Sequence, residues 1–340
     1  MTSSSDANTG PLSSADRNEK TILLLKPRGF CAGVVRAIDI VRIALDAFGP
    51  PIYVRKEIVH NRYVVEELAA KGAIFVDSVE EVPAGERVIY SAHGVSPEVR
   101  EASQRRRLRV IDATCPLVTK VHIEAVKFAR QGYSLVLIGH RDHDEVIGTL
   151  GEAPAVTQVV GTPEQVERIS VPDPNRVAYL TQTTLSLDEA KVVIEALVRK
   201  FPNIRGPAAQ DICYATENRQ VAVKQVASEA ELVLVVGSEN SSNSNRLVEV
   251  ADNLGTRSFL IENYRSIRPE WLESVKTIAL TAGASAPECL VEEVVAFLKQ
   301  SGFTNLQELE VMPENVRFGL PPEIIETITA APAPHAAGAE

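Results

Sequence analysis

Residues 110–118 read Val-Ile-Asp-Ala-Thr-Cys-Pro-Leu-Val, and this stretch decides the fold class. A short apolar run ends at Asp112, and Cys115 stands between that run and the helical period that follows it. Two other stretches resemble it, Arg28-Gly-Phe-Cys31-Ala-Gly-Val and Asp211-Ile-Cys213-Tyr-Ala-Thr. Their recurrence at intervals of roughly 80–100 residues predicts three similar units, each with a cysteine between the end of a strand and the start of a helix.

Short apolar runs alternate with longer helical periods from Lys20 to about Leu298, which is typical of parallel α/β units. Many runs lack polar alternation, as expected for strands buried on both faces. We predict an α/β fold of three similar parallel lobes around one centre, with helices that include Ala190–Lys200 and Leu290–Lys299. The expected strands are Thr21–Leu25, Ile52–Arg55, Val88–Ser91, Val110–Asp112, Leu135–Ile138, Ala178–Leu180, Leu232–Val236, Ser258–Ile261 and Thr277–Leu280.

The repeat and the composition of the two ends divide the chain into segments. The Ser/Asp/Asn-rich start lacks an apolar stretch, and the Ala/Pro-rich end is of low complexity, so both are expected to be disordered. The expected segments are a leader at 1–20, lobes at 21–115, 116–209 and 210–300, a C-terminal strap at 301–328 and a tail at 329–340.

Charge and hydropathy exclude several classes of function. A net charge of -10 opposes binding to a polyanionic backbone, so we expect no nucleic-acid partner, and the run Arg105–Arg107 is read as a solvated helix face. No apolar run reaches the ~20 residues that a membrane-spanning helix needs. The leader has no secretory apolar region, and its acidic residues argue against an organelle transit peptide. We therefore expect a cytoplasmic protein without a membrane anchor.

The four cysteines are expected to be reduced in that compartment. A helix N-terminus favours the thiolate, which is the form that binds metals, so Cys31, Cys115 and Cys213 together could hold a soft metal centre with one open position. Zinc with three cysteines is one alternative, although the chain has no C-x₂₋₄-C pair. A [4Fe–4S] cluster suits widely separated ligands as well or better. Cys289 lacks the shared pattern and is expected to be structural.

Polar loops follow several predicted strands. They contain His60, His93 and His143 and many hydroxyl and amide groups, which suit a phosphate or diphosphate at helix N-termini. Helix capping explains some of them, such as Ser285 three residues before Glu288, but the Ser/Asn run at 238–245 exceeds what one cap requires. Glu145, two residues after His143, is either a proton donor or a solvent-facing residue of a first helical turn. The other loop residues are Thr183, Thr184, Ser241, Ser242 and Asn243.

Several strings resemble those of the 4-hydroxy-3-methylbut-2-enyl diphosphate reductase (LytB) family of isoprenoid synthesis, over residues 21 to about 325. The strings are Pro27-Arg-Gly-Phe-Cys31-Ala-Gly-Val, His60-Asn-Arg-Tyr-Val-Val, Ser91-Ala-His93-Gly-Val-Ser, Asp112-Ala-Thr-Cys115-Pro-Leu-Val-Thr-Lys-Val-His, Thr181-Gln-Thr-Thr-Leu-Ser, Asp211-Ile-Cys213-Tyr-Ala-Thr-Glu-Asn-Arg-Gln, Gly237-Ser-Glu-Asn-Ser-Ser-Asn-Ser-Asn-Arg and Thr281-Ala-Gly-Ala-Ser-Ala-Pro.

The resemblance implies a trefoil-like arrangement of the lobes around one [4Fe–4S] cluster with Cys31, Cys115 and Cys213 as ligands. It implies reductive removal of the substrate hydroxyl to give isopentenyl and dimethylallyl diphosphate, with electrons from a protein such as ferredoxin or flavodoxin. By the same resemblance, Glu145 is the proton donor, with His143 and Thr183 near the substrate hydroxyl. The residues implied to bind the diphosphate are His60, His93, Ser241, Ser242, Asn243 and Ser285.

Val35 and Ile147 depart from the family pattern, because acidic residues are common at both positions. Three other classes of protein share some of these sequence features. A zinc hydrolase of phosphorylated metabolites uses similar anion loops, and a non-catalytic iron–sulfur sensor needs an output surface that the sequence does not show. A nicotinamide-dependent enzyme is disfavoured because Gly29-Phe-Cys-Ala-Gly33 is not a G-x-G-x-x-G turn.

Overall fold

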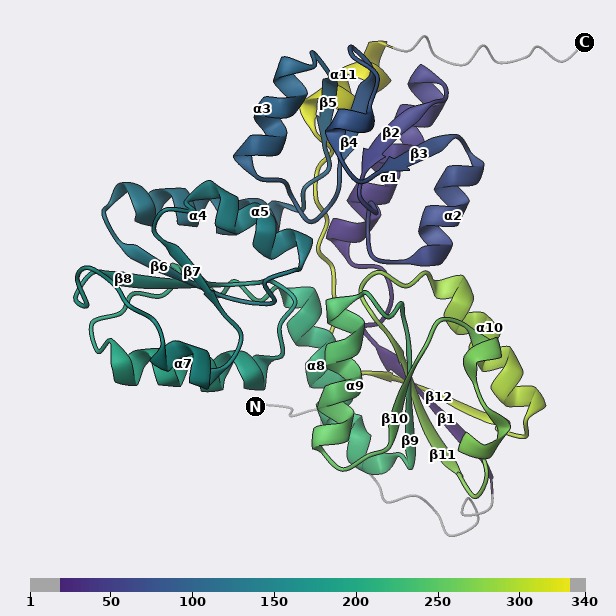
Figure 1. Ribbon diagram of the computed structural model, residues 1–340. Helices are drawn as coiled ribbons and strands as arrows, with labels where there is room; N and C mark the ends of the chain where they lie inside the picture. Colours follow the sequence, from purple (N-terminus) through teal and green to yellow (C-terminus); the bar gives the residue numbers. More distant parts are fainter. Residues whose placement is uncertain (1–18, 331–340) are drawn as a thin grey trace, which may run out of the picture.

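The computed structural model describes residues 19–330 and contains three sheets, each of them entirely parallel. Each sheet is the centre of one α/β lobe, and the three lobes surround a common centre in a trefoil-like arrangement (Figure 1). All the predicted strands are present, and the predicted fold class is confirmed. Within residues 19–330, no helix has the length and apolar character needed to cross a membrane.

The first lobe is built on the four-stranded sheet β3-β2-β4-β5. Its core includes Ile38 and Val41 from the first helix, packed with Ile52 and Val54 from β2. Its strands are β2 (Ile52–Arg55), β3 (Ala73–Val76), β4 (Arg87–Tyr90) and β5 (Arg109–Asp112), and its helices are α1 (Ala32–Phe48), α2 (Arg62–Ala70) and α3 (Pro97–Arg105).

The second lobe is built on the three-stranded sheet β7-β6-β8. Strand β6 lies in the middle, and its residues Leu135–Ile138 are buried because helices cover both faces of the sheet. Its strands are β6 (Ser134–Ile138), β7 (Thr157–Val160) and β8 (Val177–Thr181), and its helices are α4 (Pro116–Arg130), α5 (Asp144–Glu152), α6 (Pro163–Glu167) and α7 (Leu187–Lys200).

The third lobe is built on the five-stranded sheet β10-β9-β11-β1-β12. Every residue of Leu232–Val236 in β9 is buried, which agrees with its continuous run of apolar residues. The strands are β1 (Thr21–Lys26), β9 (Leu232–Val236), β10 (Ser258–Ile261), β11 (Thr277–Ala282) and β12 (Asn305–Glu310), and the helices are α8 (Tyr214–Val226), α9 (Ser242–Asn253) and α10 (Glu288–Gln300).

The first and last strands of the structure belong to the third lobe, although both lie outside the segment predicted for it. Strand β1 opens the predicted first lobe at 21–115, but it pairs with β11 and β12 in the third lobe, where Leu23 and Leu25 join the core. Within the predicted strap at 301–328, β12 completes the same sheet, and the chain then runs to α11 (Pro322–Ala330), whose Ile324 packs in the core of the first lobe (Figure 1). Residues 1–18 of the leader and 331–340 of the tail lie outside the described residues.

The carboxyl ends of the strands face the centre of the trefoil. Residues that follow β4, β6, β8, β9 and β11 line one cavity there, together with the starts of α1, α4 and α8. Parallel sheets place their helix N-termini at this edge, which is where ligands of α/β proteins bind. The fold therefore directs three sets of helix N-termini to one site.

Candidate functional site

The central cavity has a volume of about 100 Å³ and is lined by residues of all three lobes. Each of the predicted site residues lines it, although they come from sequence positions as far apart as 31 and 285. The cavity is lined by Cys31, His60, His93, Cys115, His143, Glu145, Thr183, Thr184, Cys213, Ser241, Ser242, Asn243 and Ser285, together with small and apolar neighbours.

Three cysteines form one end of the cavity. Cys31, Cys115 and Cys213 are the N-cap residues of α1, α4 and α8. Gly33 lies between two of the thiols: a Cβ at this position would be 2.8 Å from Cys115 Sγ and 3.8 Å from Cys31 Sγ. Only a residue without a side chain leaves the space in which these sulfur atoms approach one another.

Cys213 reaches this position by a different route from the one predicted. It does not follow a strand: helix α7 and residues 201–212 intervene after β8. Its backbone N–H donates to Thr183 O (3.0 Å), and its Sγ lies 3.2 Å from Thr216 Oγ1. A loop anchored to the residues after β8 therefore replaces the strand end that precedes the other two cysteines.

The thiols need a positively charged partner to ionise. Burial, together with repulsion from the neighbouring thiolates, raises the pKa of Cys115 to about 12 and that of Cys213 to about 11. No lysine or arginine is among the described residues that line the cavity. A metal centre would supply the missing positive charge, because coordination deprotonates thiols directly. The donor set therefore suits a soft, thiolate-bound centre.

Glu145 lies in the cavity wall in the first turn of α5 and is 2% exposed, so the solvent-facing alternative is wrong. Its Oε1 accepts a hydrogen bond from Thr183 N (2.6 Å), and its Oε2 accepts one from Thr183 Oγ1 (3.0 Å). Burial raises the pKa of Glu145 to about 7, although both bonds from Thr183 act in the opposite direction. A carboxyl group with this pKa holds a proton near neutral pH and can release it.

Three imidazole rings form a cluster beside Glu145. The rings of His60 and His93 are stacked with centroids 4.0 Å apart. The His143 ring is nearly perpendicular to both, with its centroid 5.3 Å from that of His60 and 5.8 Å from that of His93. Burial lowers the pKa of His93, and it lowers that of His143 to about 3, so both rings are neutral. Because His143 Nδ1 accepts from Glu145 N (3.2 Å), the ring hydrogen of His143 is on Nε2.

Hydroxyl and amide groups join the three lobes around the rest of the cavity. Ser241 is the N-cap of α9, and its Oγ accepts from Ser244 N. Ser285 Oγ donates to His60 O (2.9 Å) in the first lobe, and Ser242 Oγ donates to Thr184 O (3.1 Å) in the second. Asn243 Oδ1 accepts from Ala284 N (2.8 Å). These small donors at helix N-termini suit an anion with several oxygen atoms.

Sequence reasoning did not assign Tyr214, Thr216 or Asp211 to the site. Tyr214 OH accepts from Ala32 N (3.2 Å), so α8 supports the start of α1. Asp211 Oδ2 accepts from Thr181 N (2.9 Å), and Asp211 Oδ1 from Lys120 Nζ (2.9 Å). All three lie within the string Asp211-Ile-Cys213-Tyr-Ala-Thr, and their nearness to Cys213 could have pointed to them. The atypical Val35 and Ile147 are 42% and 44% exposed and do not line the cavity.

The chain matches the family model described as LytB protein over residues 22–299. A 4-hydroxy-3-methylbut-2-enyl diphosphate reductase of Acidothermus cellulolyticus is 54% identical over 92% of this chain and 92% of its own. One of Aromatoleum aromaticum is 55% identical over 90% of this chain and 98% of its own. A solved E-1-hydroxy-2-methyl-but-2-enyl-4-diphosphate reductase of Plasmodium falciparum superposes with a TM-score of 0.89 and 40% identity, covering 92% of this chain and 98% of that one.

Three α/β lobes around a cavity lined by thiols, a buried carboxyl group and hydroxyl and amide groups agree with these relatives, and the match shows that the chain is an oxidoreductase. The match extends through all three lobes, so it includes every residue of the cavity. The chain belongs to the LytB family, and the resemblance seen in the sequence is confirmed.

Proposed function

We propose that the chain reduces 4-hydroxy-3-methylbut-2-enyl diphosphate to isopentenyl and dimethylallyl diphosphate. The substrate loses its C4 hydroxyl, takes up two electrons one at a time and two protons, and releases water. The observation that carries the proposal is the position of Glu145, which holds a proton near neutral pH in the same small cavity as the three thiols. The names of the relatives supply the substrate.

The thiol set fits one [4Fe–4S] cluster. Cys31, Cys115 and Cys213 would hold it, and three ligands leave one iron atom without a protein ligand. When bound, the cluster supplies one-electron transfer and a Lewis-acidic iron atom for the substrate hydroxyl. A small one-electron carrier such as ferredoxin or flavodoxin is proposed as the electron donor.

The protein's own residues would bind the substrate and move one of the two protons. Ser241, Ser242, Asn243 and Ser285 donate hydrogen bonds to the diphosphate, with His60 and His93 beside them. Because these donors carry no positive charge, they bind the anion without holding it in a fully deprotonated state. The diphosphate can therefore itself deliver the proton that goes to carbon.

Glu145 would protonate the C4 oxygen as the carbon–oxygen bond breaks, so that water leaves rather than hydroxide. Thr183 fixes both carboxyl oxygens through its N–H and hydroxyl groups, which sets the direction in which the proton is presented. His143 caps the helix that carries Glu145 and presents its Nε2 hydrogen to the same region. The three residues form one proton-delivering unit.

Anaerobic turnover tests this proposal. Protein purified without oxygen is mixed with the allylic diphosphate and a chemically reduced one-electron donor, and the products are separated. We expect both five-carbon diphosphates from the wild type. Absence of either product from a brown, iron-containing preparation would contradict the proposed reaction, whereas a colourless zinc protein would contradict the proposed cofactor.

A further inference from the structure

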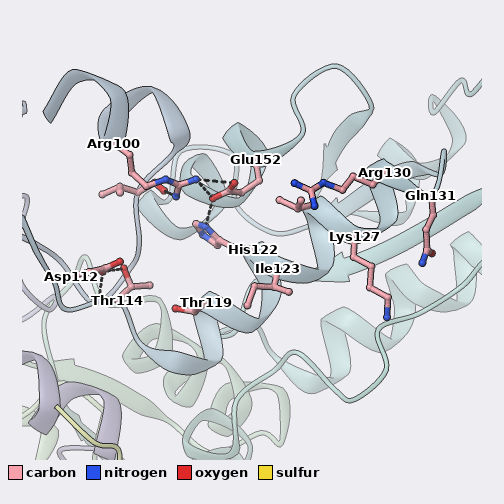
Figure 2. A pocket seen from close by; sticks show the side chains of 12 residues that line it. Arg100, Asp112, Thr114, Thr119, His122, Ile123, Lys127, Arg130, Gln131 and Glu152 are labelled. Atoms are coloured by element: carbon pink, nitrogen blue, oxygen red, sulfur yellow. Dashed lines mark hydrogen bonds and ion pairs between the residues drawn. The ribbon is translucent and has the colours of Figure 1, made fainter. Parts of the chain in front are cut away.

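Outside the central cavity, a histidine, a glutamate and an arginine form a partly buried network between the first two lobes. Figure 2 shows Arg100 and His122 converging on Glu152 beside a surface hollow of about 630 Å³, which shares no lining residue with the central cavity. Arg100 Nη2 donates to both oxygens of Glu152 (2.8 and 2.9 Å), and His122 Nδ1 lies 2.9 Å from Glu152 Oε1. Arg100 belongs to α3, His122 to α4 and Glu152 to the end of α5.

The network stabilises the position of α5, which carries His143 and Glu145 at its other end. The side chain of Glu152 is 8% exposed, and its hydrogen bonds with His122 and Arg100 outweigh burial and lower its pKa. Arg100 Nη1 also donates to Val95 O (3.0 Å), two residues after His93. One end of α5 is thus fixed to the loop of the first lobe that carries His93.

The opposite edge of the His122 ring fills a slot between two glycines. A Cβ at Gly94 would lie 3.2 Å from His122 Nε2, and one at Gly148 would lie 3.3 Å from it. Gly94 follows His93 with a φ of 81°, and Gly148 is three residues after Glu145 on α5. His122 Nε2 is buried and has no hydrogen-bond partner within the described residues, so this edge acts through contact alone.

Helix α5 can lie against this loop because its inner face has no side chain there. A Cβ at Gly151 would be 2.4 Å from Ser96 Cβ, and one at Gly148 would be 3.5 Å from Gly94 C. The His122 ring is the spacer at this contact. Its thickness sets how closely the helix that carries Glu145 approaches the loop that carries His93.

We propose that His122, held by Glu152 and Arg100, is a positioning residue that sets Glu145 and His143 against His93 across the boundary between the first two lobes. The inference rests on the proposed function of the central cavity. His122 does not touch the substrate in this account. Its effect on the reaction passes through the placement of its neighbours, for which displacements of about 1 Å cost up to about 10²-fold in rate.

A double-mutant cycle tests the inference. His122→Ala should lower kcat/KM by about tenfold, with a fall in kcat and a rise in KM, while iron and sulfide per chain stay at the wild-type values. Combined with His93→Gln, it should lower kcat/KM by clearly less than the product of the two single effects, because both changes disturb one arrangement. His122→Asn keeps an N–H near the position of Nδ1 and should recover part of the loss.

Lys127→Ala is the matched control, since Lys127 is exposed on the same helix. Its effect should be small and should multiply with that of His93→Gln. If the effects of His122→Ala and His93→Gln also multiply, or if His122→Ala has no effect, the inference is overturned. If His122→Ala does not fold, Arg100→Ala is judged by the same criteria, since the Arg100 side chain is 41% exposed. Failure of the wild type to turn over would instead contradict the proposed function.

Discussion

The four cysteines of the chain all lie at or near the start of a helix, but they occupy two very different regions. Cys31, Cys115 and Cys213 are N-cap residues that meet in the central cavity, whereas Cys289 is exposed in the first turn of α10. The expectation of a structural role for Cys289 fits poorly with that exposure. A helix N-terminus alone therefore does not make a metal site. What distinguishes the three cavity cysteines is that three lobes bring their thiols together in one partly buried cavity.

Among the variants that test this difference between the cysteines, Cys115→Ser should have the largest effect on turnover. Loss of one of the three thiolate ligands should lower turnover by at least about 10³-fold, because even changes outside the ligand set of a metal site cost about 10–100-fold. Steady-state rates under anaerobic conditions check this expectation. Full turnover by the serine variant would mean that the cavity thiols do not hold the reactive centre.

Glu145→Gln tests the other functional group of the cavity. It keeps the size of the side chain but removes its proton, so kcat should fall by about 10²- to 10⁴-fold. Visible absorption should stay that of the wild type, because Glu145 is not a proposed ligand. Unchanged kcat with an intact cluster would show that another group protonates the leaving hydroxyl.

The pH dependence of kcat/KM should follow the proton of Glu145. Since its pKa lies at about 7 and the protonated form is the donor, activity should decline as the pH rises through about 7, by about tenfold per unit beyond it. The residual activity of Glu145→Gln should not show this decline. A wild-type profile that stays flat from pH 6 to 9 would contradict the assigned role.

Thr183→Val should have a smaller effect with a characteristic direction. The variant keeps the N–H bond to Glu145 Oε1 but loses the hydroxyl bond to Oε2, which should lower kcat by about tenfold. The hydroxyl bond lowers the pKa of Glu145, so its loss should move the decline in activity to higher pH. A shift to lower pH would be the opposite of what the geometry requires.

Cys289→Ser is the control with the smallest expected effect. The residue is exposed and is not among the residues that line the cavity, so turnover should be unchanged and the free energy of unfolding should change by less than about 0.5 kcal/mol. Thermal unfolding and steady-state rates measure both. Loss of activity here would remove the distinction between the two kinds of cysteine.

Much of the fold could be predicted from apolar runs, and the exceptions have physical reasons. Strands such as β9 are continuous runs of buried residues and are read directly from the sequence. Strand β12, with the sequence Asn-Leu-Gln-Glu-Leu-Glu, lies at a sheet edge and contains only two apolar residues, so no continuous apolar run marks it in the sequence. The pairing of β1 with β11 joins residues more than 250 positions apart, which no local pattern encodes.

The candidate site was predictable as a set of residues, because most of them stand in distinctive strings of the family, and His143 and Glu145 lie together in one polar loop after a predicted strand. Their mutual arrangement was not. The two hydrogen bonds between Thr183 and Glu145 and the burial that raises the pKa of Glu145 depend on how α5 and the loop after β8 meet. The same holds for His122, whose contact with Gly94 crosses a lobe boundary that the sequence does not reveal.

The most direct test of the account is the iron and sulfide content of protein purified without oxygen, measured in parallel for the wild type, Cys115→Ser and Cys289→Ser. We predict about four iron and four sulfide per chain for the wild type and for Cys289→Ser, and far less for Cys115→Ser. Equal content in all three proteins, or zinc without sulfide in the wild type, would contradict the claim that the three cysteines of the cavity hold an iron–sulfur cluster.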